Sequence, residues 1–102
     1  MLGIDIVDIN RIDTQKTIIS HVLTELEMKE YCAKHTQKQK ILYFAGRFAA
    51  KEAIFKATQD KDYLTYSILN DSTGKPYIKD HPDLEISISH DAGIAIAIVK
   101  NT

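Results

Sequence analysis

The chain has 102 residues, of which 44% are hydrophobic and 26% charged, and its formal net charge at pH 7 is −1. This length and composition predict one globular domain over residues 1–102 with a single modest core. The near-neutral charge argues against general nucleic-acid binding. No apolar run is long enough for a membrane span, and the N-terminus lacks the basic start of a signal peptide. Cys32 is the only cysteine, which excludes an intrachain disulfide and favours a cytoplasmic location.

Residues 2–9 are rich in β-branched side chains and predict a strand whose residues alternate between two faces. On one face Asp5 is a lone acid between Gly3 and Val7. Aspartate is a poor strand former and an expensive core residue, so its carboxylate needs a partner. A structural partner would be backbone N–H groups or an arginine. Residues 10–13 then predict a turn or short helix.

Two capping boxes mark the starts of helices. Thr24 followed by Glu27 predicts a short helix through residue 31, and Thr36 followed by Gln39 predicts a long helix that ends near residue 57. Residues 58–62 break the helical pattern.

Glu52 lies on an unexpected face of the long helix. In ideal geometry, about 100° per residue, it falls within an apolar stripe that consists of Ile41, Phe44, Ala45, Phe48 and Phe55. Burying an unpaired carboxylate is costly, so Glu52 needs a partner. Lys56, one turn on, could supply a structural salt bridge, but an exposed pair of this kind is worth only about 0.3–0.5 kcal/mol. The alternative is that Glu52 points into a site and meets a cation there.

Strands are predicted at residues 64–69, at 77–79 after a turn at 70–76, and in a hairpin formed by 84–90 and 94–100. This order predicts an α+β fold in which the long helix packs on a small antiparallel sheet. Ala95 and Ala97 alternate with isoleucines in the last strand, and such small residues permit close approach of another element. Together with the small core, they point to oligomerisation.

Asp5 and Glu52 would converge if the long helix packs on the first strand. Two such acids repel each other unless one is protonated or a cation lies between them. One or two carboxylates with water or phosphate oxygens form the usual Mg²⁺ site. Arg47, Lys51 and Lys56 lie within about a turn of Glu52 and could bind phosphate oxygens. The residues alone therefore predict a Mg²⁺ and phosphate site of unknown substrate.

Four ordered segments resemble one family: Gly-Ile-Asp-Ile-Val-Asp-Ile-Asn-Arg-Ile at 3–12, Phe-Ala-Gly-Arg-Phe-Ala-Ala-Lys-Glu-Ala at 44–53 with Lys-Ala at 56–57, Gly-Lys-Pro at 74–76 and Ile-Ser-Ile-Ser-His at 86–90. They are similar to the motifs of the holo-(acyl-carrier-protein) synthases, the small bacterial 4′-phosphopantetheinyl transferases. The resemblance implies Mg²⁺-dependent transfer of 4′-phosphopantetheine from coenzyme A to a serine of apo acyl carrier protein, with release of adenosine 3′,5′-bisphosphate, in support of fatty acid biosynthesis. It also implies the fold of that family and a homotrimer with active sites at the subunit interfaces.

The resemblance also assigns roles to residues. Asp5 and Glu52 match metal ligands that bridge Mg²⁺ to the pyrophosphate, and Lys56 matches a lysine that neutralises it; these three form the predicted catalytic set. The positions that match coenzyme A contacts are Arg47, Lys51, Lys56, Lys75, Pro76 and His90. Arg11 matches a residue that docks the acidic helix of the carrier, and Lys16 is a substitute for arginines that this chain lacks. The proton of the carrier serine is expected to pass to Glu52, directly or through water, or to a metal-bound water.

The chain departs from the family pattern at residues 58–63, which are acidic and lack the usual glycines. Two other functions fit the residues. One is a Mg²⁺-dependent phosphohydrolase of a nucleotide or coenzyme A. The other is a non-catalytic trimeric module that binds an acidic helix through the base-rich residues 29–56.

Overall fold

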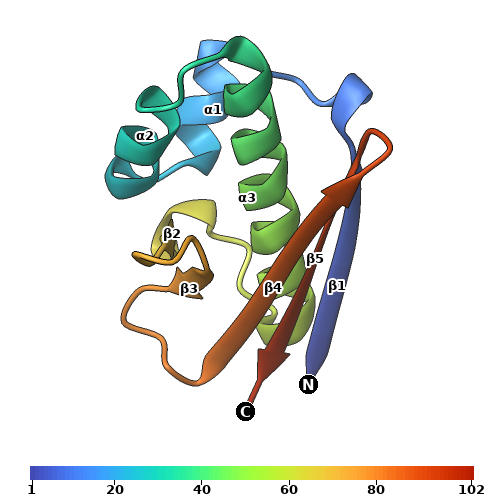
Figure 1. The fold of residues 1–102 in the computed structure, drawn as a ribbon. Helices are drawn as coiled ribbons and strands as arrows, with labels where there is room; N and C mark the ends of the chain where they lie inside the picture. The colour runs from blue at the N-terminus through green and yellow to red at the C-terminus, as the bar shows by residue number, and fades with distance from the viewer.

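The structure, a computed structural model, describes all 102 residues. In chain order its elements are β1 (Leu2–Asp8), α1 (Lys16–Val22), α2 (Glu25–Cys32), α3 (Gln37–Thr58), β2 (Ile68–Asn70), β3 (Pro76–Ile78), β4 (Leu84–Asp91) and β5 (Ile94–Asn101). Short 3-10 helices occur at Ile9–Arg11 and Tyr63–Thr65. Figure 1 shows α3 lying across one face of the main sheet, with α1 and α2 packed beside its first turns and both chain termini at the opposite end.

β5 is the central strand of a three-stranded antiparallel sheet with the order β1-β5-β4. The first strand of the chain therefore pairs with the last. The predicted hairpin of β4 and β5 is confirmed, and its two-residue loop, Ala92 and Gly93, has positive φ angles of 51° and 78°. Such loops match the twist of the flanking strands. β2 and β3 form a separate two-stranded sheet. No helix is long and apolar enough to cross a bilayer.

Both predicted capping boxes are present. The Thr24 and Thr36 side chains accept hydrogen bonds from the backbone at Glu27 and Gln39, and the Glu27 and Gln39 side chains accept from the backbone N–H groups of Thr24 and Thr36. These reciprocal bonds satisfy donors that a helix start leaves free. The local sequence is thus sufficient to fix where α2 and α3 begin.

The most buried face of α3 is a row of alanines rather than the predicted stripe around Glu52. One residue per turn of this row is fully buried, and β5 opposes it with small residues of its own: Ala45, Ala49, Ala53 and Ala57 from α3, and Ala95, Ala97 and Val99 from β5. Glu52 is only half-buried, beside this row. Small side chains on both elements let the helix lie close to the sheet.

This packing corrects the interpretation of the alanines in the last strand. Ala95 and Ala97 contact α3 within the same chain and do not offer a surface to another subunit. The outward face of the sheet instead carries exposed apolar side chains, namely Leu2, Ile4, Ile6, Ile94 and Ile98.

The strand predicted at residues 64–69 is shorter than expected. Residues Tyr63–Thr65 form a 3-10 helix, and β2 begins only at Ile68. Side chains bind the backbone polar groups of this segment. The Asp62 carboxylate accepts from the N–H of Leu64, and the Lys51 ammonium donates to the Tyr63 carbonyl. These bonds compete with sheet pairing, as capping by aspartate generally does.

Gly3 sets the distance between β1 and α3. A Cβ atom at this position would overlap the carbonyl oxygen of Ala53 and lie 2.9 Å from the backbone nitrogen of Ala57. The clash would be with helix backbone, which cannot rotate away as a side chain can.

We therefore expect Gly3→Ala to destabilise the protein by about 2 kcal/mol, within the range of overpacked cores. Gly46→Ala is the control, because a Cβ atom there would meet only the Ile88 side chain, at 3.3 Å. The free energy of unfolding in urea is the measurement. Equal stability of the Gly3→Ala variant and the wild type would contradict the close approach of β1 and α3.

Candidate functional site

Asp5 and Glu52 line the same cavity, which has a volume of about 530 Å³. The predicted alternation along β1 places Asp5 on the face toward α3, between the buried Gly3 and Val7. Glu52 reaches this cavity from α3, one residue before Ala53 of the buried alanine row. The structure therefore brings the two carboxylates together, as the sequence predicted.

Each carboxylate has one oxygen bound by a donor. Lys56 Nζ lies 3.2 Å from Asp5 Oδ1 and 2.9 Å from the Ile4 carbonyl oxygen. The Tyr63 hydroxyl donates to Glu52 Oε1 at 2.5 Å. The structural alternative for Glu52, a salt bridge to Lys56, does not form, because Lys56 pairs with Asp5 instead.

The second oxygens, Asp5 Oδ2 and Glu52 Oε2, accept no hydrogen bond from the protein and are not buried. Two unoccupied carboxylate oxygens at one cavity are a donor set that fits Mg²⁺, which takes one or two carboxylates and completes its shell with water or phosphate oxygens. No group of three or more His, Cys, Asp or Glu side chains gathers to hold a metal. The protein would thus supply two ligands, and water or substrate the others.

Tyr63 stays a hydrogen-bond donor at ordinary pH. Burial, followed by the hydrogen bond to Glu52 and the charges of Glu52 and Asp5, raises the pKa of the Tyr63 phenol to about 12. Its ring also lies 6.0 Å from that of Phe48, which lines the same cavity. No sequence pattern pointed to Tyr63, since it lies in the irregular segment after α3.

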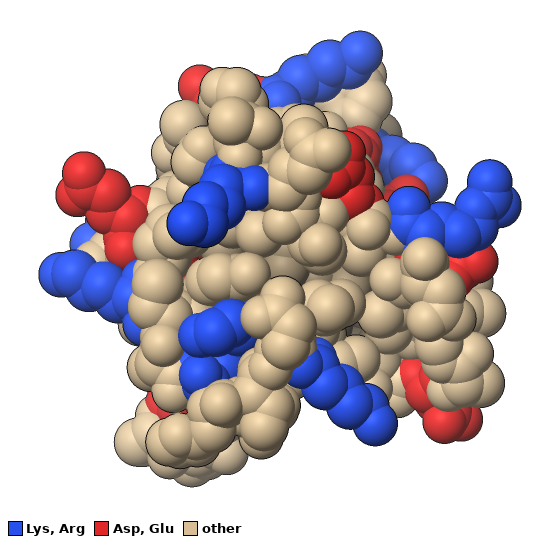
Figure 2. Space-filling view, turned by 90° about the horizontal axis from the view of Figure 1, so that it is seen from above, with Lys and Arg blue, Asp and Glu red and all other residues tan.

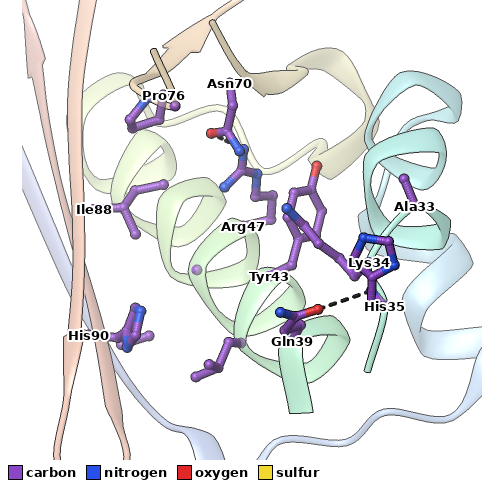
Figure 3. A pocket seen from close by; sticks show the side chains of 14 residues that line it. Ala33, Lys34, His35, Gln39, Tyr43, Arg47, Asn70, Pro76, Ile88 and His90 are labelled. Carbon is purple, nitrogen blue, oxygen red and sulfur yellow. Dashed lines mark hydrogen bonds between the residues drawn. The ribbon is translucent and has the colours of Figure 1, made fainter. Parts of the chain in front are cut away.

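Arg47, Pro76 and His90 line a second cavity, of about 500 Å³, on another side of α3 (Figure 3). The α3 side chains form one wall, Ile88 and His90 of β4 the opposite one, and the α2–α3 connection closes the end (Figure 3). The two cavities share no lining residue.

Arg47 is held firmly in this second cavity. Its Nε donates to the Ile68 carbonyl at 3.0 Å and its Nη2 to Asn70 Oδ1 at 2.8 Å, and its guanidinium carbon lies 4.2 Å from the centre of the Tyr43 ring. Glu30 accepts from Arg47 Nη2 at 3.4 Å. Nη1 has no hydrogen-bond partner in the protein and remains available for a ligand.

Lys51 does not line either cavity, which corrects its predicted contact with coenzyme A. Only 3% of the residue is exposed. Its Nζ donates to Glu27 Oε1 and to the carbonyl oxygens of Val22 and Tyr63, at 2.5, 2.6 and 2.7 Å. Burial lowers the pKa of Lys51, and the Glu27 carboxylate opposes that shift. All three ammonium protons are used, so none is free for a phosphate.

Glu27 is the fully buried partner that sequence reasoning treated only as a capping residue. It also accepts from the backbone N–H of Ile68 at 2.8 Å. The Glu27–Lys51 pair thereby ties α2 and β2 to α3.

The remaining predicted residues lie at the edges. Arg11 is exposed and lines the Asp5 cavity, while Lys16 is the exposed first residue of α1. Lys75 is exposed beside Pro76 but lines a different groove, between β3 and β4. On the face seen in Figure 2, basic and acidic side chains are interspersed and no continuous basic patch forms. The non-catalytic binding module gains no support from this face.

Comparison with known proteins identifies the family. A model of the 4′-phosphopantetheinyl transferase superfamily matches residues 1–99. The holo-(acyl-carrier-protein) synthase of Acholeplasma laidlawii is 38% identical over 108 residues, covering 96% of this chain and 92% of that protein. The synthase of Bacillus cytotoxicus is 37% identical over 109 residues, covering 96% of this chain and 91% of that protein.

Solved structures agree. The holo-(acyl-carrier-protein) synthase of Bacillus anthracis, in complex with coenzyme A (3′,5′-ADP), superimposes with a TM-score of 0.82 and 32% identity over 96% of this chain and 91% of that one. The Helicobacter pylori synthase, in complex with coenzyme A, superimposes with a TM-score of 0.78 and 33% identity over 97% of both chains. The chain therefore belongs to the 4′-phosphopantetheinyl transferase superfamily and, within it, to the holo-(acyl-carrier-protein) synthases, which are enzymes.

We expect Lys51→Met to cost about 3 kcal/mol of stability, because it leaves the Glu27 carboxylate buried without its counter-charge. Lys79→Met is the control, since the Lys79–Asp80 pair is largely exposed and should change stability by less than about 1 kcal/mol. Urea unfolding of both variants is the measurement. A Lys51→Met variant as stable as the control would show that the pair is not structural.

Proposed function

We propose that this chain transfers the 4′-phosphopantetheine group of coenzyme A to a serine of an apo acyl carrier protein, with Mg²⁺ as cofactor. The observation that carries the proposal is the convergence of Asp5 and Glu52 on one cavity, each with a free oxygen. The synthases of B. anthracis and H. pylori support coenzyme A as the donor, because both were solved as coenzyme A complexes. The family supports a role in fatty acid biosynthesis in the cytoplasm.

In the reaction, the serine hydroxyl of the carrier attacks the β-phosphorus of the coenzyme A pyrophosphate. The new P–O bond forms on the serine as the bond to adenosine 3′,5′-bisphosphate breaks. Asp5 and Glu52 would hold Mg²⁺, which would supply charge neutralisation at the pyrophosphate. Because Tyr63 engages Glu52 Oε1 and Oε2 would be a metal ligand, we assign the serine proton to a water at the site, the other acceptor that the sequence allowed.

Lys56 adds positive charge beside the carboxylates. Its Nζ is fixed next to Asp5, yet half of its side chain is exposed, so it can also meet a pyrophosphate oxygen. A lysine acts on phosphate as a point charge and needs no bidentate geometry.

The second cavity is the proposed place for the rest of coenzyme A. Arg47 presents a free Nη1 there, and His90 and Pro76 line the same space. A volume of about 500 Å³ lies within the range of ligand pockets. Arg11 and Lys16 are proposed to meet the acidic helix of the carrier, since both are exposed.

We propose that the enzyme is a homotrimer with interface active sites. Within one chain the carboxylates and the proposed coenzyme pocket line separate cavities, and a neighbouring copy would bring one of each together. The outward face of the main sheet, with Ile4 and Ile6 more than half exposed, supplies an apolar surface for association.

The first test is the intact mass of an apo acyl carrier protein incubated with the enzyme, coenzyme A and Mg²⁺. We expect a gain of one phosphopantetheine, abolished by EDTA and reduced at least about 100-fold by Glu52→Gln at unchanged stability, because a metal ligand contributes at least as much as the groups that orient it. Glu25→Gln, an exposed carboxylate in the first turn of α2, is the matched control. Coenzyme A cleaved without a carrier would favour the phosphohydrolase, and intact coenzyme A with an unchanged carrier would leave only a binding role.

The second test concerns assembly. Ile4→Asp places a charge on the outward sheet face without touching the core, so it should convert the trimer to single chains. Light scattering after size-exclusion chromatography measures the mass, with Leu26→Asp on α2 as the control for an exposed apolar residue elsewhere. A wild type with the mass of one chain, 11.5 kDa, would overturn the trimer.

A further inference from the structure

Tyr63 is attached to the rest of the chain at three points. Its carbonyl oxygen accepts from the buried Lys51 ammonium at 2.7 Å, its ring lies 6.0 Å from that of Phe48, and its hydroxyl donates to Glu52 Oε1. Lys51 is itself held by Glu27, which is fully buried. A side chain fixed in this way has little freedom, so it can fix its partner.

The segment that carries Tyr63 is held by its own side chains. Asp60 Oδ1 accepts from the backbone N–H of Asp62, and Asp62 Oδ1 accepts from the N–H of Leu64, both at 3.0 Å. The Thr58 hydroxyl accepts from the N–H of Asp60 at 3.2 Å. These bonds order the connection between α3 and the 3-10 helix. They therefore help to fix the position of the Tyr63 ring along α3.

The hydroxyl contact distinguishes the two oxygens of Glu52. The terminal torsion of a glutamate side chain is broad, so an unrestrained carboxylate presents either oxygen, or both. Tyr63 occupies Oε1, which leaves Oε2 as the oxygen without a partner. Mg²⁺ demands near-ideal octahedral geometry, which a single, fixed oxygen per carboxylate serves well.

We propose that Tyr63 is a positioning residue: it orients the Glu52 carboxylate so that Oε2 alone faces the cavity shared with Asp5. The proposal rests on the proposed function, in which Glu52 is a metal ligand. Tyr63 does not touch substrate or metal and acts only through Glu52. Its counterpart at the other carboxylate is Lys56, which occupies Asp5 Oδ1 in the same manner.

The test is Tyr63→Phe, which removes the hydroxyl and keeps the ring. Mn²⁺, which also prefers oxygen ligands, is titrated into the protein with coenzyme A, and binding is followed by electron paramagnetic resonance. We expect about 10-fold weaker Mn²⁺ binding, the usual effect of losing a group that orients a ligand, and a similar rise in the Mg²⁺ concentration for half-maximal transfer. The KM for the carrier should not change.

Tyr31→Phe is the matched control, because Tyr31 lies on α2, where its ring packs against Tyr43, and its hydroxyl bonds neither Glu52 nor the segment that carries Tyr63. It should leave Mn²⁺ binding unchanged. Both variants are also compared in thermal unfolding, so that a general loss of structure is separated from a change at the site.

A double-mutant cycle distinguishes orientation from packing. In the Glu52→Asp background the carboxylate is one methylene shorter and lies out of reach of the Tyr63 hydroxyl, so adding Tyr63→Phe should no longer weaken Mn²⁺ binding. Two outcomes would overturn the role of Tyr63, provided that the wild type transfers phosphopantetheine. Either Tyr63→Phe weakens Mn²⁺ binding equally in the wild-type and Glu52→Asp backgrounds, or the Tyr63→Phe variant binds Mn²⁺ as tightly as the wild type. A wild type that neither binds Mn²⁺ nor modifies a carrier would overturn the proposed function and the inference together.

Discussion

The close contact between β1 and α3 is the constraint on which the site depends. Gly3 lets the backbone of α3 lie against the strand, with no room for a Cβ atom beneath Ala53. Two residues further along the same face, Asp5 therefore meets the cavity into which Glu52 projects from α3. The distance between the two carboxylates is thus determined by backbone packing, which is more rigid than any arrangement of long side chains.

The charged residues of α3 divide by helical position. Arg47 and Lys51, one turn apart, turn toward the carboxylates of Glu30 and Glu27 and hold α2 and β2 in place. Lys56, one turn beyond Glu52, reaches β1 instead. Lys51 is spent entirely on structure, Arg47 holds its neighbours and keeps Nη1 free, and the half-exposed Lys56 remains available to a ligand. One base-rich helix therefore supplies both the framework and the site.

Much of the fold follows from local signals in the sequence. The reciprocal capping bonds at Thr24 and Thr36 define two helix starts, and the alternation around Asp5 orients the first strand correctly. The role of Lys51 was not accessible in this way, because a helical wheel shows which residues share a face but not which acid from α2 meets them. The role of Tyr63 could not be predicted for a related reason. An irregular segment has no side-chain periodicity to analyse, and only the tertiary fold brings the Tyr63 hydroxyl to Glu52.

In β1 the usual relation between alternation and burial is reversed, because the larger apolar side chains lie on the exposed face of the sheet. The aliphatic side chains of β1 point away from the core, while glycine, aspartate and valine point into it. A strand with one face against a helix normally buries its larger apolar residues there. In this strand the inner positions are taken by the close contact at Gly3 and by the acid of the site, so the larger residues lie outside. The same requirement that places Asp5 beside Glu52 therefore leaves the larger apolar side chains of β1 exposed on the outward face of the sheet.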